Sequence, residues 1–272
     1  MQIWQALLLG LIQGLTEFLP VSSSGHLVLS QYLLGLDASV AEGTLFEVCV
    51  HFGTVMSIVT VYGRRIGKLV AAGVQLLIKP HRIRSLYQDD VNAKTVLLIA
   101  LTMVPTGLAY IFFGDYLEAK FSDPRFTSGM LLVTGALLLL TMIRKNPSGD
   151  LNLPKAFLVG VSQALALFPG ISRSGSTICT ALYVNVDPQK AADFSFLMLL
   201  PVVLGATALK LFNAVSAPAE IEWSALLAGT LVAYISGVAA IKILLEVIRR
   251  GKLQYFAIYC FAIGIAGLLL ID

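Results

Sequence analysis

Long apolar runs constrain this chain more than any other feature. Six stretches are each long enough to cross a bilayer, which takes about 20 residues of helix; they are residues 45–62, 93–113, 127–143, 191–212, 223–245 and 254–271. The chain of 272 residues is 57% hydrophobic and only 13% charged, whereas a soluble domain carries about 25% charge. The pattern predicts an all-α polytopic membrane protein and excludes an ordinary soluble domain.

Two further apolar regions, 1–35 and 154–184, are interrupted by polar turns. The interruptions are Pro20-Val21-Ser22-Ser23-Ser24-Gly25 and Pro169-Gly170-Ile171-Ser172-Arg173-Ser174-Gly175. Each half is short for a span, so we expect two re-entrant helix hairpins in addition to six spanning helices. The first 20 residues lack a basic start and contain Gln13 and Glu17, so we expect them to belong to the mature protein.

Basic residues are unevenly distributed among the predicted loops. The loops rich in Lys and Arg are 63–92, 144–155 and 246–252. The other loops contain only Lys120 and Arg125 between them and are 36–44, 114–126 and 213–222. The positive-inside rule places the first group in the cytoplasm, so both termini lie outside and the two hairpins enter from opposite faces. None of the basic segments is dense enough to suggest nucleic-acid binding.

The two interruptions are related in sequence. A shift of 150 residues aligns residues 10–25 with residues 160–175 without a gap, and it pairs Gln13 with Gln163 and each Ser-x-Ser-Gly segment with the other. With three spans after each hairpin, the second copy is inverted. The sequence predicts one membrane domain, 1–272, whose inverted-repeat halves are about 1–143 and 151–272, an architecture known from transporters.

Several polar side chains fall inside the apolar zone, where ionisable groups are costly and usually face a cavity or partner. Gln13 and Glu17 are four residues apart and share a helix face. The helix after each turn would present its N-terminus to an anion, and Arg173 has the planar fork that suits phosphate oxygens.

These features suggest phosphoryl chemistry. Ser23 is a candidate nucleophile if a base takes its proton, and His26, three residues away, is close enough to be that base. Glu17 could orient His26 or help to hold a divalent cation. Glu47 and His51 are expected near the outer boundary, without a functional role.

The segment from Gln13 to His26 resembles the (E/Q)xxxE and PxSSxGH signature of the bacterial undecaprenyl-diphosphatase, or bacitracin-resistance, family. The segment from Pro169 to Thr177 resembles the PGxSRSxxT motif of that family. The resemblance implies hydrolysis of undecaprenyl diphosphate to undecaprenyl phosphate and inorganic phosphate, which recycles the lipid carrier of cell-wall synthesis. It also implies a bacterial inner-membrane location and a site open to the outer side.

The same resemblance assigns roles to individual residues. It implies Ser23 as nucleophile, His26 as base, Glu17 in the acidic motif and Arg173 on the diphosphate. The residues expected to contact the substrate are Gln13, Ser22, Ser24, Ser172, Ser174 and Thr177. A divalent cation, Mg or Ca, is implied; because Gln13 stands where some members have Glu, Glu17 and the lipid diphosphate would have to hold it.

Two other functions remain open from the residues alone. The inverted repeat also fits a lipid-phosphate flippase, while an intramembrane serine protease using Ser23 and His26 is disfavoured by Arg173. The expected partners are the prenyl diphosphate lipid and membrane lipids, with no nucleic acid. The sequence leaves the oligomeric state open, a homodimer included.

Overall fold

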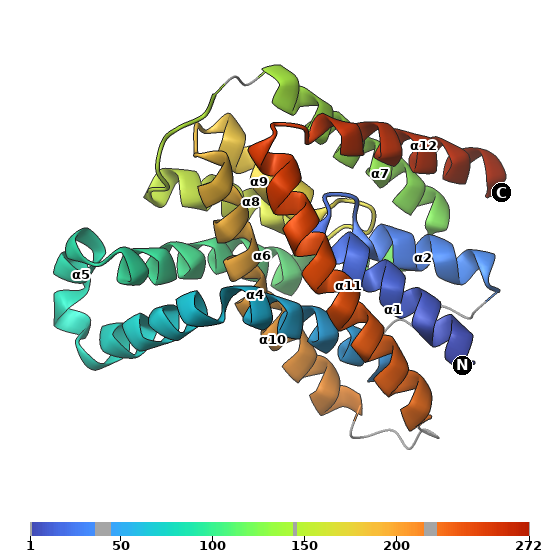
Figure 1. The fold of residues 1–272 in the computed structure, drawn as a ribbon, viewed down its shortest axis with the longest axis horizontal. Helices are drawn as coiled ribbons and strands as arrows, with labels where there is room; N and C mark the ends of the chain where they lie inside the picture. Colours follow the sequence, from blue (N-terminus) through green and yellow to red (C-terminus); the bar gives the residue numbers. More distant parts are fainter. Residues whose placement is uncertain (1, 36–44, 144–145, 215–221, 272) are drawn as a thin grey trace.

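The structure, a computed structural model, describes residues 2–35, 45–143, 146–214 and 222–271, with the side chains of 206–214 left out (Figure 1). The described residues are helical and contain no β-strand. The helices are α1 Ile3–Phe18, α2 Ser23–Leu33, α4 Leu45–Ile78, α5 Ile83–Asp89, α6 Val91–Phe121, α7 Pro124–Leu140, α8 Leu153–Leu165, α9 Arg173–Tyr183, α10 Pro188–Ala214, α11 Trp223–Arg249 and α12 Gln254–Leu270, with 3-10 turns η1 Pro80–Arg82 and η2 Thr141–Ile143.

Four described helices are long and apolar enough to cross a membrane, which confirms the prediction of an all-α membrane protein. They are Leu45–Ile78, Val91–Phe121, Pro124–Ile143 and Trp223–Arg249. The predicted span 254–271 forms α12, whose 17 residues extend about 26 Å. The predicted span 191–212 lies in α10, but part of it falls among residues whose side chains are not described.

Two predicted loops are largely helical instead. Helix α4 continues past the end of its apolar run to Ile78, and α6 continues to Phe121. Arg64 and Arg65 are exposed on the continuing helix; because Arg favours helix almost as well as Ala does, the end of an apolar run does not end a helix. The C-terminal part of α4 and the N-terminal part of α6, joined through η1 and α5, form an arm at the left of Figure 1. The predicted loop 36–44 and most of 213–222 lie outside the described residues.

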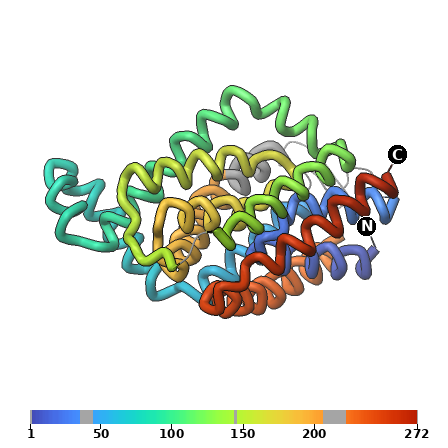
Figure 2. Tube along the Cα trace, turned by 90° about the horizontal axis from the view of Figure 1, so that it is seen from above, coloured from blue at the N-terminus to red at the C-terminus, as the bar shows by residue number. Residues whose placement is uncertain are grey.

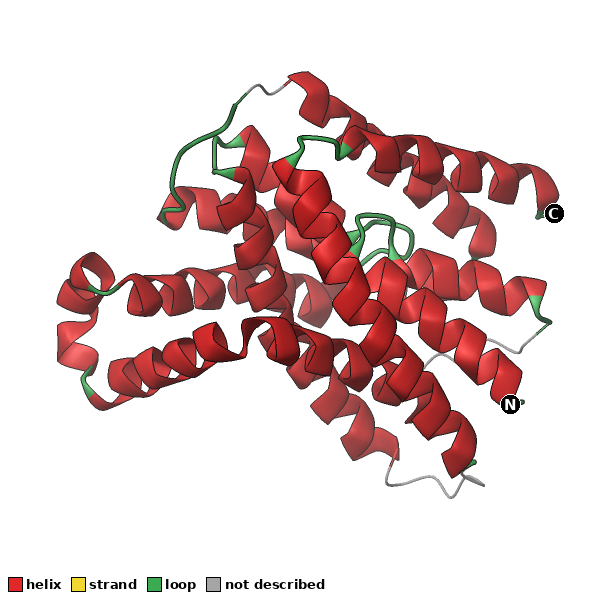
Figure 3. Ribbon diagram, in the orientation of Figure 1, coloured by secondary structure: helices red, strands yellow, loops and turns green. Residues whose placement is uncertain are grey.

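Both interrupted regions form helix–turn–helix units. In Figure 1, α1 starts at the end of the molecule where α12 finishes, whereas α8 starts from the side of the α5 arm. The turns that follow α1 and α8 meet near the centre and are the green loops there in Figure 3. The two units therefore run inward from opposite ends.

The two units pack in corresponding ways on the long helices. Helix α1 lies along α11, and α8 lies along α6. A Cβ added to Gly10 would overlap the backbone of Gly229, and one added to Gly160 would lie 2.7 Å from Cα of Thr102. Small residues let membrane helices approach closely, so the aligned Gly10 and Gly160 are both packing residues. On another face, α7 and α12 lie side by side, as Figure 2 shows in green and red.

The two turns also contact each other reciprocally. A Cβ added to Gly25 would lie 3.1 Å from Cα of Gly170, and a Cβ added to Gly175 would lie 3.3 Å from Cβ of Pro20. Each short helix thus begins against the turn of the other unit. This contact brings Ser23 and Arg173, the first residues of α2 and α9, to the same place.

Candidate active site

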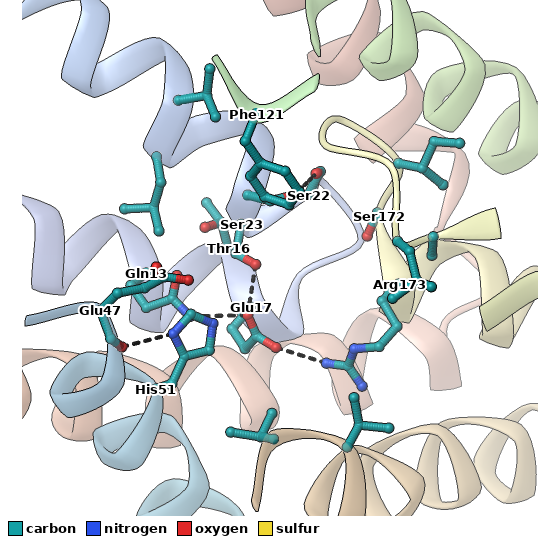
Figure 4. Close-up of a pocket in the computed structure, with 18 of the residues that line it drawn as sticks. Gln13, Thr16, Glu17, Ser22, Ser23, Glu47, His51, Phe121, Ser172 and Arg173 are labelled. Atoms are coloured by element: carbon teal, nitrogen blue, oxygen red, sulfur yellow. Dashed lines mark hydrogen bonds and ion pairs between the residues drawn. The ribbon is translucent and has the colours of Figure 1, made fainter. Parts of the chain in front are cut away.

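A cavity of about 260 Å³ lies where the two turns meet α4 and α10 (Figure 4). Its polar lining residues are Gln13, Thr16, Glu17, Ser22, Ser23, Ser24, Gln31, Glu47, His51, Ser172 and Arg173. The rest of the lining is apolar and includes Leu27, Val28, Leu199 and Val203. Such a cavity can hold a molecule that has both a charged group and an apolar chain.

Glu17 is the centre of the polar part of the cavity. Its Oε1 accepts a hydrogen bond from Nη2 of Arg173 at 2.8 Å, and the two side chains are only 6% and 15% exposed, respectively. Its Oε2 accepts from Oγ of Ser23 at 2.6 Å and from Nε2 of Gln13 at 3.0 Å. Arg173 and the two neutral donors compensate the buried negative charge. A serine hydroxyl therefore donates directly to a carboxylate, as a nucleophile does to its base.

The helix starts at the cavity are capped by matched serines. Oγ of Ser22 accepts from the backbone N–H of Gly25 at 3.2 Å, and Oγ of Ser172 accepts from Gly175 at 3.1 Å. An N-cap satisfies one of the four unpaired N–H groups of a helix start and leaves the others free. The N-termini of α2 and α9 therefore give this cavity a partial positive charge.

The chain adopts an unusual conformation just before Ser23. Ser22 has φ of 70°, a region that costs a residue other than glycine about 1–3 kcal/mol and that often occurs at functional sites. In the second turn the positive φ, 93°, falls on Gly170, while Ser172 is extended at −70°. The two turns differ in backbone as well as in chemistry.

Not all predicted site residues reach the cavity. Gln13, Glu17, Ser22, Ser23, Ser24, Ser172 and Arg173 line it, whereas His26, Ser174 and Thr177 do not. Oγ of Ser174 lies 3.3 Å from Oγ of Ser172. Thr177 is hydrogen-bonded to Ser195, with their Oγ atoms 2.7 Å apart. Ser174 and Thr177 therefore make hydrogen bonds within the protein, outside the lining of the cavity.

His26 lies on the side of α2 that faces α12. Its Nδ1 is 2.8 Å from the carbonyl oxygen of Ser22, and its Nε2 is 2.8 Å from the hydroxyl of Tyr259, on whose ring it stacks. The hydrogen bond to the preceding turn draws the imidazole away from Ser23, whose hydroxyl donates to Glu17 instead. The expectation that His26 takes the proton of Ser23 does not fit this arrangement.

The sequence interpretation missed Glu47 and His51. Both line the cavity from α4, and Figure 4 shows the His51 ring beside the Glu17 carboxylate. They are four residues apart, the same spacing as Gln13 and Glu17, so they share a face of α4. That shared spacing was the available signal, and their position near the start of the apolar run 45–62 concealed it.

The cavity can contribute only part of a cation site. Among the described residues, no group of three His, Cys, Asp or Glu side chains could hold a metal ion. Oε1 of Gln13 is buried without a hydrogen-bond partner and adjoins Glu17. One carboxylate and one amide oxygen suit Mg²⁺, which is usually held by one or two carboxylates, water and substrate phosphates.

Comparison with known proteins agrees with this geometry. Residues 6–266 match the family model described as bacitracin resistance protein BacA. An undecaprenyl-diphosphatase of Salinibacter ruber is 57% identical, over 98% of this chain and 99% of its own. Undecaprenyl-diphosphatases of Halothermothrix orenii and Bacteroides fragilis are each 38% identical, and the matches cover at least 97% of every chain involved. The chain therefore belongs to the bacitracin resistance protein BacA family.

Proposed function

We propose that this protein hydrolyses undecaprenyl diphosphate to undecaprenyl phosphate and inorganic phosphate, and so recycles the lipid carrier of cell-wall synthesis. The observation that carries the proposal is the hydrogen bond from Ser23 to Glu17 beside Arg173. Ser23 as nucleophile, Glu17 as its base and Arg173 as the phosphate-binding group line one cavity with apolar walls. The full-length similarity to undecaprenyl-diphosphatases supports the same substrate. Transport alone would not need a nucleophile and base, so hydrolysis is favoured over a flippase.

In the first step, Oγ of Ser23 attacks the terminal phosphorus and gives its proton to Oε2 of Glu17. The new bond joins Oγ to phosphorus, and the bond that breaks joins this phosphorus to the bridging oxygen. Undecaprenyl phosphate leaves with that oxygen. Water then hydrolyses the phosphoserine and releases inorganic phosphate.

Arg173 has a donor free for the substrate. Its Nη2 is bonded to Glu17, but its Nη1 is buried without a partner. Phosphate oxygens would satisfy Nη1 and would meet the N-termini of α2 and α9, which favour anions. Groups that are fixed before the substrate arrives stabilise the developing charge without reorganisation. Ser22, Ser24 and Ser172 lie at the same helix starts.

A divalent cation, Mg or Ca, is part of the proposal. Glu17, Oε1 of Gln13 and the diphosphate oxygens would hold it. When bound, it would neutralise negative charge on the phosphates. The chain's own contribution is to place one carboxylate and one amide oxygen beside the nucleophile.

We also propose the membrane arrangement in detail: six spans, two re-entrant hairpins and inverted halves of about 1–143 and 151–272. The matching packing of Gly10 and Gly160 on α11 and α6 supports the repeat. The basic residues of the α5 arm support a cytoplasmic location for that end, so the cavity would open to the periplasmic side of the inner membrane. The homodimer stays a prediction.

The test is phosphate release from a prenyl diphosphate by the purified full-length protein with magnesium or calcium. We expect turnover by the wild type and a loss of at least about 10³-fold in Ser23→Ala, since Ser23 is the cavity hydroxyl that donates to Glu17. Ser85→Ala is the matched control, because Ser85 lies on α5, away from the cavity.

Two results would count against the proposal. A wild-type protein that releases no phosphate would remove the enzyme assignment. Substantial turnover by folded Ser23→Ala would instead mean that water attacks the diphosphate directly, and it would leave hydrolysis standing.

A further inference from the structure

The cavity contains a histidine that the first step does not use. His51 lies on α4, one turn after Glu47, and both residues line the cavity. Figure 4 shows its ring between Glu47 and Glu17. The charged side chains around it in the described lining are Glu17 from α1, Glu47 from α4 itself and Arg173 from α9. The described cavity residues of α10, such as Leu199 and Val203, are apolar.

One ring nitrogen of His51 is already committed. Its Nδ1 lies 2.8 Å from the backbone carbonyl oxygen of Glu47. A carbonyl oxygen only accepts hydrogen bonds, so Nδ1 carries the hydrogen and the neutral ring has its lone pair on Nε2. Within the described part of the chain, the hydrogen bond of the ring is made through Nδ1. The backbone thus orients His51 and leaves a proton acceptor facing the cavity.

His26 is placed differently from His51. Its two nitrogens are engaged by the carbonyl of Ser22 and the hydroxyl of Tyr259, and it does not line the cavity. The third histidine, His81, is in η1 on the arm. His51 is therefore the histidine that lines the described cavity.

The proton balance of the second step requires an acceptor besides Glu17. Glu17 receives the proton of Ser23 in the first step, and in the structure its Oε2 lies 2.6 Å from Oγ of Ser23. When the Oγ–phosphorus bond breaks, the same proton returns to Oγ. The water that attacks phosphorus in line, from the side opposite Oγ, must therefore give its proton to another group.

We propose that Nε2 of His51 is the general base of the second step and accepts the proton of the attacking water. This inference rests on the proposed two-step hydrolysis. One bond forms between the water oxygen and phosphorus, and the bond between phosphorus and Oγ of Ser23 breaks. The water proton goes to Nε2, the Glu17 proton goes to Oγ, and His51 afterwards releases its proton to solvent. General-base catalysis contributes about 10²- to 10⁴-fold.

The experiment is rapid-quench analysis of full-length His51→Leu, which keeps an apolar helix but has no base. Lipid monophosphate and inorganic phosphate are measured separately, and intact-protein mass reports a phosphoryl group on Ser23. We expect a burst of about one lipid monophosphate per protein, with phosphate release slowed by about 10²-fold or more. His81→Leu, the same substitution on the arm, should show no burst and wild-type rates. A role in packing alone would not separate the two products in time.

His51→Gln is the second variant, because its amide can keep a hydrogen bond to the Glu47 carbonyl but cannot take a proton. If His51→Leu does not fold, this variant decides the question by the same burst. Folded variants that release both products together, at wild-type or at reduced rates, overturn the assignment of His51 to the second step. Absence of phosphoserine in every protein, with turnover intact, removes the two-step mechanism and leaves hydrolysis itself unaffected.

Discussion

The buried pair of Glu17 and Arg173 allows stability and activity to be separated. Removing one partner of a buried ion pair costs about 3–5 kcal/mol, because the other charge is left unpaired. In Arg173→Ala, Glu17 would keep its hydrogen bonds from Ser23 and Gln13. Since these donors partly compensate the carboxylate, we expect a loss near the lower end, about 3 kcal/mol.

A double-substituted protein provides the comparison. Glu17→Gln combined with Arg173→Met removes both charges and keeps similar side-chain lengths. The double variant should therefore lose much less stability than Glu17→Gln and Arg173→Met lose when their separate losses are added. In thermal unfolding, 3 kcal/mol corresponds to a fall of roughly 6–12 °C for a chain of this size. Arg173→Ala, the double variant and its two single variants should all lack prenyl diphosphatase activity, because each removes the base, the phosphate-binding group or both.

The result that would refute the reasoning is simple additivity. If the double variant loses as much as both single variants together, the two charges are not coupled in the folded protein. A catalytically competent Arg173→Ala protein would separately refute the role of Arg173 in binding phosphate.

Three further predictions concern other parts of the structure. Gly10→Ala should lower stability, measured by thermal unfolding, by about 1–3 kcal/mol through overpacking on α11. The control is Gly63→Ala, where a Cβ meets nothing within 4 Å; it should be neutral or raise stability by up to about 1 kcal/mol. Equal effects of the two substitutions would contradict the packing role of Gly10. Tyr259→Phe should lower stability by about 0.5–1.5 kcal/mol by removing the hydrogen bond to His26, while turnover stays within about threefold. A large loss of turnover would instead indicate that His26 takes part in the reaction. Chelation of divalent cations should stop turnover but shift the unfolding midpoint by less than about 2 °C, because Glu17 is already paired within the protein; a large shift would indicate a structural metal.

The sequence predicted the all-α class and the two interrupted helical units because both depend on the local pattern of apolar and polar residues. Apolar runs of about 20 residues identify spans, and the Ser-rich interruptions became the turns between α1 and α2 and between α8 and α9. The ends of the spans were less accurate: α4 and α6 extend well past their apolar runs. Helix continuation depends on backbone hydrogen bonds, which polar residues also support.

The shared location of three motif residues could be predicted from the alignment of the two turns. Glu17, Ser23 and Arg173 could be brought together in advance because the aligned turns had to meet. The position of His26 was harder to predict, because closeness in sequence places it near Ser23, whereas its side chain points from α2 toward Tyr259. His51 comes from a different helix, so its arrival at the cavity depends on tertiary packing that periodicity does not encode.

The reciprocal contact of the two turns has a consequence for how the chain can vary. Because Gly25 abuts Gly170 and Gly175 abuts Pro20, neither half holds a complete catalytic notch. A chimera that joins the N-terminal half of this chain to the C-terminal half of a distant relative would pair two surfaces with separate histories. The residues of the two turns are thus expected to change together. A substitution at one turn limits which residues fit at the other turn, about 150 residues away in the sequence.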